Sequence, residues 1–351
     1  MGVAAKVRRG VARALDATLL ETEDPTALGL LRILVVSVMT ASMLTHIGSV
    51  AEYFSDDAWL AGDAARQAFH SRWSVFFYVS DPWAVRAIFT LGVVAHLLWI
   101  VGLFTPVAAF VAWAVWASMV GRNPLLYALP DALHGVMAFL MMLLPTGRGL
   151  SLDARRHGPR PVPIWCRRVV QAQIAVVYVA TGLLKTGKTW RADGTALYYT
   201  LANPYNRHFS MAPLLASLQP YVLRPMTWVV LAWEVGFGGF VVSHWLRETF
   251  GRPRRWPDLR WVFLGFGLLM HAGIQALLYV AWFTPMMMAS YAAFLRPEET
   301  RAILGRLARL RRSKRAREEA LRPDEADAEL ESPDEVAAED ANEDADGPGT
   351  T

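Results

Sequence analysis

The fold class is decided by residues 261–283, which read WVFLGFGLLMHAGIQALLYVAWF. This run of 23 residues contains no Asp, Glu, Lys or Arg. About 20 apolar residues in a helix are enough to cross the hydrocarbon core of a bilayer, which is roughly 30 Å thick. The run therefore predicts a membrane-spanning helix. It makes a soluble enzyme, a disulfide-built secreted domain and a nucleic-acid-binding protein poor explanations of the chain.

Apolar runs recur along the rest of the 351-residue chain, of which 54% is hydrophobic. Eight spans are predicted, at 27–49, 83–104, 106–120, 131–147, 164–185, 226–246, 261–283 and 284–295. The dipeptide Thr284-Pro285 is either a turn between the last two spans or a kink in one long helix. The predicted fold class is all-α, a polytopic transmembrane helix bundle of about eight spans.

Basic residues predict the orientation, because cytoplasmic loops carry an excess of Lys and Arg. Segment 148–168 holds six Arg and segment 247–260 holds five, whereas segment 51–82 has two basic residues against five acidic ones. Eight spans with both termini in the cytoplasm place both Arg-rich loops on the inner side. We therefore expect a multi-pass protein of the inner (plasma) membrane.

Composition divides the chain into four parts. Residues 1–23 carry apolar side chains at four-residue spacing among basic ones and predict an amphipathic helix on the membrane surface. Residues 24–297 form the transmembrane domain, and residues 298–321 predict a second basic amphipathic helix. The tail, residues 322–351, is expected to be disordered, because 12 of its side chains are acidic and few are apolar. Outside residues 323–351 the chain carries a net charge of +16, which favours anionic lipid as a partner over nucleic acid.

Ionisable side chains inside a bilayer are costly and usually face a bundle interior or a water-filled cavity. Eight such residues fall within or at the ends of the predicted spans: Arg32, His46, His96, Asp131, His134, Lys185, Glu234 and His271. Each is a candidate for function, and each also has a structural explanation.

Lys185 is the most distinctive candidate, because the chain has only four Lys among its 35 basic residues. Gln171, Tyr178, Thr181 and Lys185 are spaced to form one polar stripe on a helix. A desolvated lysine is a possible general base. The structural alternative is a lysine that extends from a helix end to the lipid headgroups.

The other candidates also keep two interpretations. His271, Gln275 and Tyr279 form either a hydrogen-bonding strip along a cavity or polar contacts between helices. Glu234 requires protonation or a cation such as Lys185 or Arg32.

Asp131 and His134 share one face at the outer end of the fourth span, as a proton relay or as an N-cap and a packed histidine. No zinc-like ligand spacing and no phosphate-binding loop stand out, so we expect no metal.

Several short motifs resemble the HTTM domain, the multi-spanning module of vitamin K-dependent gamma-carboxylases and their bacterial relatives. The similarity extends over roughly residues 20–297. The motifs are Leu30-Leu-Arg32-Ile, Tyr53-Phe-Ser-Asp56, Arg122-Asn-Pro124, Leu144-Pro-Thr-Gly-Arg148, Tyr178-Val-Ala-Thr-Gly-Leu-Leu-Lys185 with Trp190, and His271-Ala-Gly-Ile-Gln275.

The resemblance implies a mechanism. In the carboxylases a lysine deprotonates vitamin K hydroquinone, whose reaction with oxygen yields a stronger base. That base abstracts a glutamate γ-proton before carbon dioxide adds. Lys185 aligns with this lysine, and His271 and Gln275 resemble a histidine and glutamine of the family. The resemblance thus implies Lys185 and His271 as catalytic residues and a reduced quinone (vitamin K or menaquinol) as cofactor.

Further roles follow for the neighbouring residues. Tyr178, Thr181, Trp190 and Gln275 are expected to contact the cofactor, Glu234 to balance charge and Tyr198 to line the cavity. Two departures weaken the similarity. His134 lies one turn from the position of a further carboxylase histidine. A basic helix and an acidic tail stand where the carboxylases carry a large peptide-binding domain.

Two functions remain open from the sequence. The first is quinol-coupled modification of a peptide or small substrate by a carboxylase-like membrane enzyme. The second is a non-enzymatic membrane partner in the maturation, export or tolerance of a secreted peptide. A transporter ranks third, because no inverted repeat supports it.

Overall fold

The computed structural model describes residues 16–250 and 258–320. It is mostly helical, at 76%, and it divides into two units, residues 1–300 and residues 301–351. Eight helices of the first unit carry its core: α2 (Thr26–Leu44), α5 (Pro82–Val101), α6 (Thr105–Arg122), α7 (Leu129–Leu143), α9 (Trp165–Leu184), α13 (Arg224–Phe250), α14 (Arg260–Leu277) and α15 (Phe283–Ser290).

Short elements connect these helices. The α-helical ones are α3 (Val50–Phe54), α4 (Gly62–Ala68), α8 (Leu152–His157), α10 (Lys188–Arg191), α11 (Ala196–Ala202) and α12 (Ala212–Leu218). The 3-10 and π turns are η1 (Asp16–Leu20), η2 (Val75–Phe77), η3 (Pro124–Leu126), η4 (Thr146–Arg148), η5 (Gln219–Leu223) and η6 (Tyr291–Phe294). Two strands, β1 (Thr22–Glu23) and β2 (Val162–Pro163), pair antiparallel.

Four helical segments are long and apolar enough to cross a membrane: Thr26–Leu44, Pro82–Val101, Pro213–Phe250 and Arg260–Leu277. The helix Pro130–Leu143 is apolar but shorter. The prediction of a helical membrane protein is therefore confirmed.

The stretch 261–283 is not one helix, which corrects the predicted seventh span. α14 ends at Leu277, and the chain is non-helical until Phe283, where α15 begins. Ala281 in this break adopts a left-handed conformation, with φ of 48°. The break lies ahead of Thr284-Pro285, and α15 has only 8 residues, so the turn and the short eighth helix differ from the predicted bounds.

The eight core helices alternate in direction along the chain. Polar contacts show this, because they join the start of one helix to the end of another. Arg32, in the second turn of α2, donates to the carbonyls of Ile100 at the end of α5 and Thr146 after α7. Arg167, near the start of α9, bonds Glu248 at the end of α13. Arg260, which opens α14, donates to the carbonyl of Phe294. We call this end of the first unit the arginine end and the opposite end, where α9 stops before Lys185, the lysine end.

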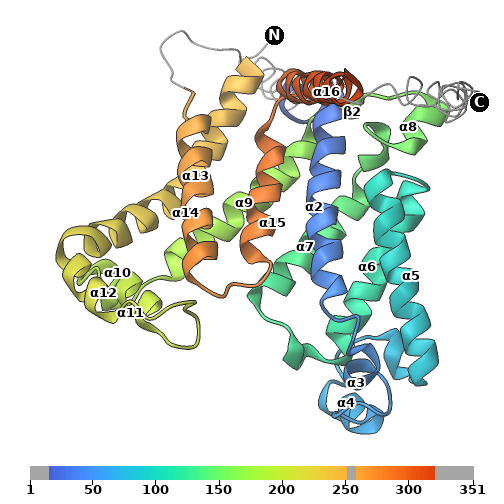
Figure 1. The fold of residues 1–351 in the computed structure, drawn as a ribbon, viewed down its shortest axis with the longest axis horizontal. Helices are drawn as coiled ribbons and strands as arrows, with labels where there is room; N and C mark the ends of the chain where they lie inside the picture. Colours follow the sequence, from blue (N-terminus) through green and yellow to red (C-terminus); the bar gives the residue numbers. More distant parts are fainter. Residues whose placement is uncertain (1–15, 251–257, 321–351) are drawn as a thin grey trace, which may run out of the picture. The chain divides into compact units, whose positions relative to one another are not determined.

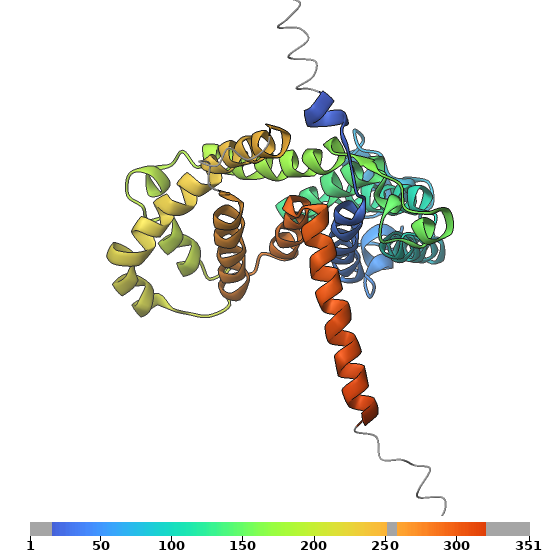
Figure 2. The ribbon, with the colours of Figure 1, turned by 90° about the horizontal axis from the view of Figure 1, so that it is seen from above.

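α2 is the central helix of the first unit (Figure 1). We call α2, α5, α6 and α7 the N-terminal half, and α9, α13, α14 and α15 the C-terminal half. Seen from above, α5 and α6 lie on one side of α2, and α13 and α14 lie on the other (Figure 2). The two halves share one apolar core along α2.

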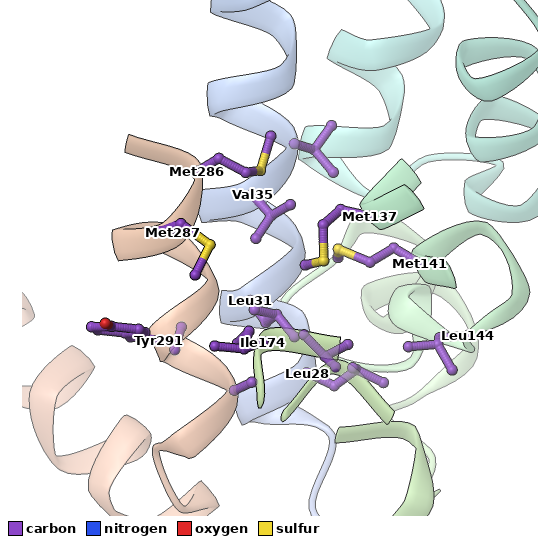
Figure 3. Close-up of a cluster of buried hydrophobic side chains, with 14 of the residues drawn as sticks. Leu28, Leu31, Val35, Met137, Met141, Leu144, Ile174, Met286, Met287 and Tyr291 are labelled. Atoms are coloured by element: carbon purple, nitrogen blue, oxygen red, sulfur yellow. The ribbon is translucent and has the colours of Figure 1, made fainter. Parts of the chain in front are cut away.

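The core is built from aliphatic, methionine and aromatic side chains. Leu31 and Val35 of α2 are fully buried between the methionines of α15 and those of α7 (Figure 3). The buried members that Figure 3 labels are Leu28, Leu31, Val35, Met137, Met141, Leu144, Ile174, Met286, Met287 and Tyr291. Methionine suits this region because its flexible side chain fills irregular gaps between helices.

Three predicted parts lie outside the transmembrane domain: the N-terminal amphipathic helix, the basic helix after the last span and the acidic tail. A helix over residues 1–23 does not extend to its last residues, since Thr22–Glu23 form β1 and only Asp16–Leu20 are helical. Residues 1–15 of that prediction and the acidic tail, 322–351, lie outside the described residues. α16 (Pro297–Ala320) extends over the basic segment predicted at 298–321 except for residue 321, which lies outside the described residues. Its contact with a membrane remains a prediction.

Candidate functional site

Lys185 and Glu234 meet at the lysine end as an ion pair. Lys185 follows the last residue of α9, and its Nζ donates to both carboxylate oxygens of Glu234 in α13. The Lys185 side chain keeps 21% of its surface exposed, and that of Glu234 keeps 9%. The sequence analysis left Glu234 either protonated or paired with a cation such as Lys185 or Arg32; the structure pairs it with Lys185.

Gly182 allows the helices to approach closely at this point. A Cβ atom at Gly182 would lie 3.1 Å from Cβ of Glu234 and 3.0 Å from Cγ2 of Val235. Small residues permit such backbone approach between helices in membranes. The glycine one turn before Lys185 therefore brings the end of α9 against the turn of α13 that carries Glu234.

Trp190 covers the amine of Lys185. The short helix α10 folds back after Lys185 and places the Trp190 ring centroid 4.7 Å from Nζ, a cation–π contact. Arg191 of the same helix donates from Nε to the Lys185 carbonyl at 3.0 Å. The amine therefore faces a carboxylate on one side and an aromatic ring on another, while part of its side chain stays accessible.

Two turns away from Lys185 along α9, Tyr178 joins a buried hydrogen-bonded network. Its hydroxyl lies 2.7 Å from Nε2 of His271 in α14 and 2.5 Å from the hydroxyl of Tyr291 in η6. Trp233, the neighbour of Glu234, packs edge-on against the Tyr178 ring with centroids 4.6 Å apart. One layer of aromatic packing thus connects this network to the ion pair.

Two predicted cofactor contacts, Thr181 and Gln275, and the predicted cavity residue Tyr198 make no hydrogen bond or ring contact with the side chains of Lys185 or Glu234 in the part of the chain that the structure describes. Thr181 donates to the carbonyls of Val177 and Tyr178 in its own helix. The side chain of Gln275 is exposed, four residues from buried His271. Tyr198 packs edge-on against Tyr199 at 5.4 Å.

Tyr279 does not continue the predicted strip of His271 and Gln275. It follows the end of α14, and its ring lies 3.8 Å from that of His208. Gln171, predicted on the stripe of Lys185, instead donates to the carbonyl of Ala293 at 2.7 Å and accepts from the Trp245 indole at 2.5 Å. Helix periodicity identified the face of α9 correctly but not its partners.

Asp131 and His134 have structural roles. Asp131 is the third residue of α7 and accepts the backbone N–H of Ala128, the N-cap residue, at 2.9 Å, so it caps the helix start from within the first turn and is not itself the predicted N-cap. His134 is buried and stacks flat on Trp116 with ring centroids 3.6 Å apart. His96 lies edge-on to His134 at 6.1 Å, and His46 lies 5.7 Å from the Tyr127 ring.

Arg32 is buried and makes no ion pair with a carboxylate of the described residues. Beyond the carbonyls of Ile100 and Thr146, it donates to that of Leu150 at 2.6 Å and approaches that of Gly149 at 3.4 Å. It therefore holds the loop after α7 against the starts and ends of α2 and α5, and takes no part in the Lys185 site.

The arginine end also contains an ion network that the sequence argument missed. Arg167 bonds Glu23 at 2.8 Å and Glu248 at 3.3 Å, and Arg260 bonds Glu299 at 2.6 Å. Partial burial raises the pKa of Glu299, but the hydrogen bond and charge of Arg260 outweigh this and lower it below its usual value. These residues lie at span ends, where a charge is ordinary in sequence, so no local signal distinguishes them.

The sequence analysis did not identify Tyr291 and Trp233 as site residues. Buried aromatic residues are common in apolar helices, and only the packed structure shows what they contact. Within residues 16–250 and 258–320, no group of three or more His, Cys, Asp and Glu side chains is arranged to hold a metal ion.

Comparison with known proteins identifies the family. The HTTM domain matches residues 20–299, which agrees with the arrangement of motifs around Arg32, Lys185 and His271. No curated protein and no solved structure matches the chain. The match extends over far more than half of the chain, and the chain therefore belongs to the HTTM domain family.

Proposed function

We propose that this HTTM protein is a quinol-dependent, carboxylase-like membrane enzyme that modifies a peptide or small substrate. The observation that carries the proposal is the Lys185–Glu234 ion pair beneath Trp190, at the end of an apolar helix. A carboxylate and an amine in direct contact exchange a proton readily, which is the requirement for acid–base chemistry. The family relation to the carboxylase membrane module supports the same assignment.

The residues around Lys185 are chemically suited to a reduced quinone. The Trp190 indole offers a flat apolar face, and the partly exposed Lys185 offers a polar group beside it. Cofactor sites commonly combine apolar walls with a few placed polar groups. When bound, a reduced quinone would supply an acidic ring hydroxyl and two electrons.

The protein's own residues would manage the proton. Transfer from Nζ of Lys185 to the Glu234 carboxylate leaves a neutral amine and a carboxylic acid, so the pair changes form without creating net charge in the membrane. The neutral amine can then accept a proton at Nζ. Glu234 balances the charge of Lys185 whenever the amine is protonated.

His271 and Tyr178 would help to position the residues of the Lys185 site from the side of the arginine end. The hydroxyls of Tyr178 and Tyr291 and Nε2 of His271 form a continuous chain of groups that can reorient their protons. Trp233, the sequence neighbour of Glu234, packs against the Tyr178 ring of this chain. We assign these residues a positioning role, because neither His271 nor Tyr178 contacts Lys185 directly.

The membrane arrangement that we propose has eight crossings of the inner (plasma) membrane with both termini in the cytoplasm. The alternation of the eight segments supports the count, and the Arg-rich arginine end supports the side. In this arrangement the lysine end and the segment 186–225 face outward.

Exposed aromatic side chains of that segment support a peptide as substrate or partner. Tyr205 is 90% exposed and Tyr221 is 83% exposed. Aromatic residues are enriched at protein interfaces. The same surface also supports the second candidate function, a non-enzymatic membrane partner of a secreted peptide.

The test uses purified protein in nanodiscs with reduced vitamin K or menaquinol, bicarbonate and a short Glu-rich peptide. Quinone epoxide and fixed carbon are measured together. We expect Lys185→Ala to lower both products by at least about 100-fold, the usual size of a lost general base, and to remain folded. The matched control is Lys188→Ala, which removes an exposed lysine of the same outer segment.

Each outcome has a defined meaning. A Lys185→Ala variant as active as the wild type would contradict the proposed mechanism. Epoxide without fixed carbon would indicate the quinol reaction with another acceptor. If neither product forms and quinol does not bind, while the protein still captures a secreted peptide, the non-enzymatic function is favoured.

A further inference from the structure

The arginine end contains a cavity that the proposed chemistry does not use. Its volume is about 730 Å³, within the range of ordinary small-molecule sites. The start of α6, the end of α7, the loop from 145 to 163 and the start of α9 surround it. It therefore lies at the opposite ends of these helices from the Lys185 site.

The lining of the cavity has an apolar part and a basic part. The apolar part includes Ala109, Met142, Leu143 and Trp165. Leu143 is 60% exposed and Trp165 is 37% exposed, so this wall continues onto the apolar outer surface of the helices. A ligand with a hydrocarbon chain matches such a wall, whereas a small soluble metabolite does not.

The basic part consists of Arg148 and Arg160, with His157 beside them. All three side chains are exposed. Neither arginine forms an ion pair with a carboxylate among the described residues, in contrast to the paired Arg167 and Arg260 at the same end. These two arginines are therefore available for an external anion.

The one carboxylate that lines the cavity is already engaged. Asp153 accepts the backbone N–H groups of Phe104 at 3.0 Å and Thr105 at 2.9 Å, and the Thr105 hydroxyl at 2.7 Å. It thus serves as a cap for the start of α6, which has no cap from its own N-cap residue. Its hydrogen-bonding capacity is used there and not by the arginines.

The backbone around the cavity is held in an unusual shape. Phe104 and Leu150 both have φ of 49°, a conformation that side chains other than glycine rarely adopt. Arg32 fixes the Leu150 carbonyl at 2.6 Å, and Arg148 donates to the Pro161 carbonyl at 2.9 Å. Strained residues persist where surrounding contacts enforce them, and they concentrate at ligand sites.

We propose that this cavity binds one anionic phospholipid of the surrounding membrane. The phosphate group contacts Arg148 and Arg160, and one acyl chain lies along Met142, Leu143 and Trp165. A phosphate is the shared chemistry of lipid headgroups and free phosphate, and the apolar wall favours the lipid. The proposal does not depend on the enzymatic function of Lys185.

Native mass spectrometry of the full chain in detergent tests the proposal, with titrations of phosphatidylglycerol and of zwitterionic phosphatidylcholine. We expect the wild type to retain one phosphatidylglycerol about tenfold more tightly than phosphatidylcholine, because each nearby arginine strengthens attraction to an anionic headgroup. The double variant Arg148→Gln/Arg160→Gln should lose this preference. The matched control, Arg66→Gln/Arg72→Gln, removes two basic side chains of segment 51–82 and should keep it.

Arg148 also holds the loop, so the single variant Arg160→Gln provides a second measurement in a folded protein. It should lose part of the preference, about threefold, with an unchanged melting temperature. Equal binding of both lipids by the wild type, or an unchanged preference in both variants, would overturn the proposal. Displacement of the lipid by millimolar inorganic phosphate would also overturn it, because the site would then bind soluble phosphate.

Discussion

The two halves of the first unit both bury histidines, but the hydrogen bonding of these histidines differs between the halves. In the C-terminal half, His271 of α14 is hydrogen-bonded to Tyr178 at 2.7 Å, and Tyr178 contacts Tyr291. In the N-terminal half, His134 of α7 stacks on Trp116, and neither of its ring nitrogens has a hydrogen-bond partner among the described residues. One histidine belongs to a polar network, and the other packs as a flat ring.

The difference extends to the buried cations. Lys185 in the C-terminal half has a carboxylate partner and partial exposure, which suits proton exchange with a ligand. Arg32 in the N-terminal half has only backbone carbonyls as acceptors and no exposed surface, which suits a structural role. The partners of these two cations, more than their place in a membrane helix, therefore distinguish the candidate site from the structural contact.

The largest expected effect on stability is that of Arg32→Met. The substitution leaves the carbonyls of Thr146 and Leu150 without their donor in a buried position, and we expect a loss of about 3 kcal/mol in the free energy of unfolding. Thermal unfolding in detergent measures it, with Arg86→Met on the exposed face of α5 as control. The structural role of Arg32 is contradicted if both variants melt at the same temperature. It is also contradicted if folded Arg32→Met protein has a reduced specific activity.

A smaller effect is expected for Tyr178→Phe, which removes the hydroxyl between His271 and Tyr291 but keeps the ring packed on Trp233. We expect about a tenfold lower turnover, with little change in melting temperature, because an organising hydrogen bond is worth about 1 kcal/mol. Epoxide formation across pH 6 to 9 measures it, and the pH profile should shift relative to the wild type. The control Tyr199→Phe alters an exposed tyrosine and should change neither the turnover nor the pH profile. A pH profile of Tyr178→Phe identical to that of the wild type would contradict the positioning role.

Asp153→Asn tests the N-terminal half through pH. Partial burial opposes ionisation, but the hydrogen bonds from Thr105 and Phe104 outweigh it and lower the pKa of Asp153 below its usual value of 3.8. A lowered pKa means that the carboxylate stabilises the fold above about pH 4 and that this contribution is lost as the pH falls through the folded-state value. We expect Asp153→Asn to cost about 1 kcal/mol at pH 7, the size of a lost helix cap, and less at pH 3.

Melting temperatures of both proteins between pH 7 and pH 3 measure this effect, and the two curves should converge at the acidic end. Asp57→Asn, an exposed carboxylate, is the control. A constant difference between Asp153→Asn and the wild type at all pH values would show that the charge of Asp153 makes no contribution.

The smallest effect is expected for His134→Phe, which replaces one flat ring by another against Trp116. Since the ring nitrogens of His134 have no hydrogen-bond partner among the described residues, their removal should leave the melting temperature unchanged or raise it slightly. Turnover should also be unchanged. The matched variant His271→Phe should lower turnover as Tyr178→Phe does, and equal behaviour of the two histidine variants would remove the distinction between the halves.

Part of the candidate site follows from sequence. The spacings of three residues from Tyr178 to Thr181 and four from Thr181 to Lys185 predict a shared face of α9. The structure has Tyr178 buried and Lys185 at the helix end. The requirement that Glu234 be protonated or find a cation is a consequence of membrane electrostatics. The roles of Thr181 and Gln275 were not predictable in this way, because periodicity identifies a face but not what lies opposite it.

The sequence by itself determined the helical membrane fold, the family and the position of Lys185 at the end of an apolar helix. In a bilayer, the backbone N–H and C=O groups of a long apolar run can form hydrogen bonds only within their own helix. The order of the motifs along the chain indicates the family. Only the tertiary structure decided which polar groups meet. Lys185 and Glu234 are 49 residues apart, and Tyr178 and His271 are 93 apart. Such contacts depend on how whole helices pack, at points such as Gly182, and no local pattern encodes that packing.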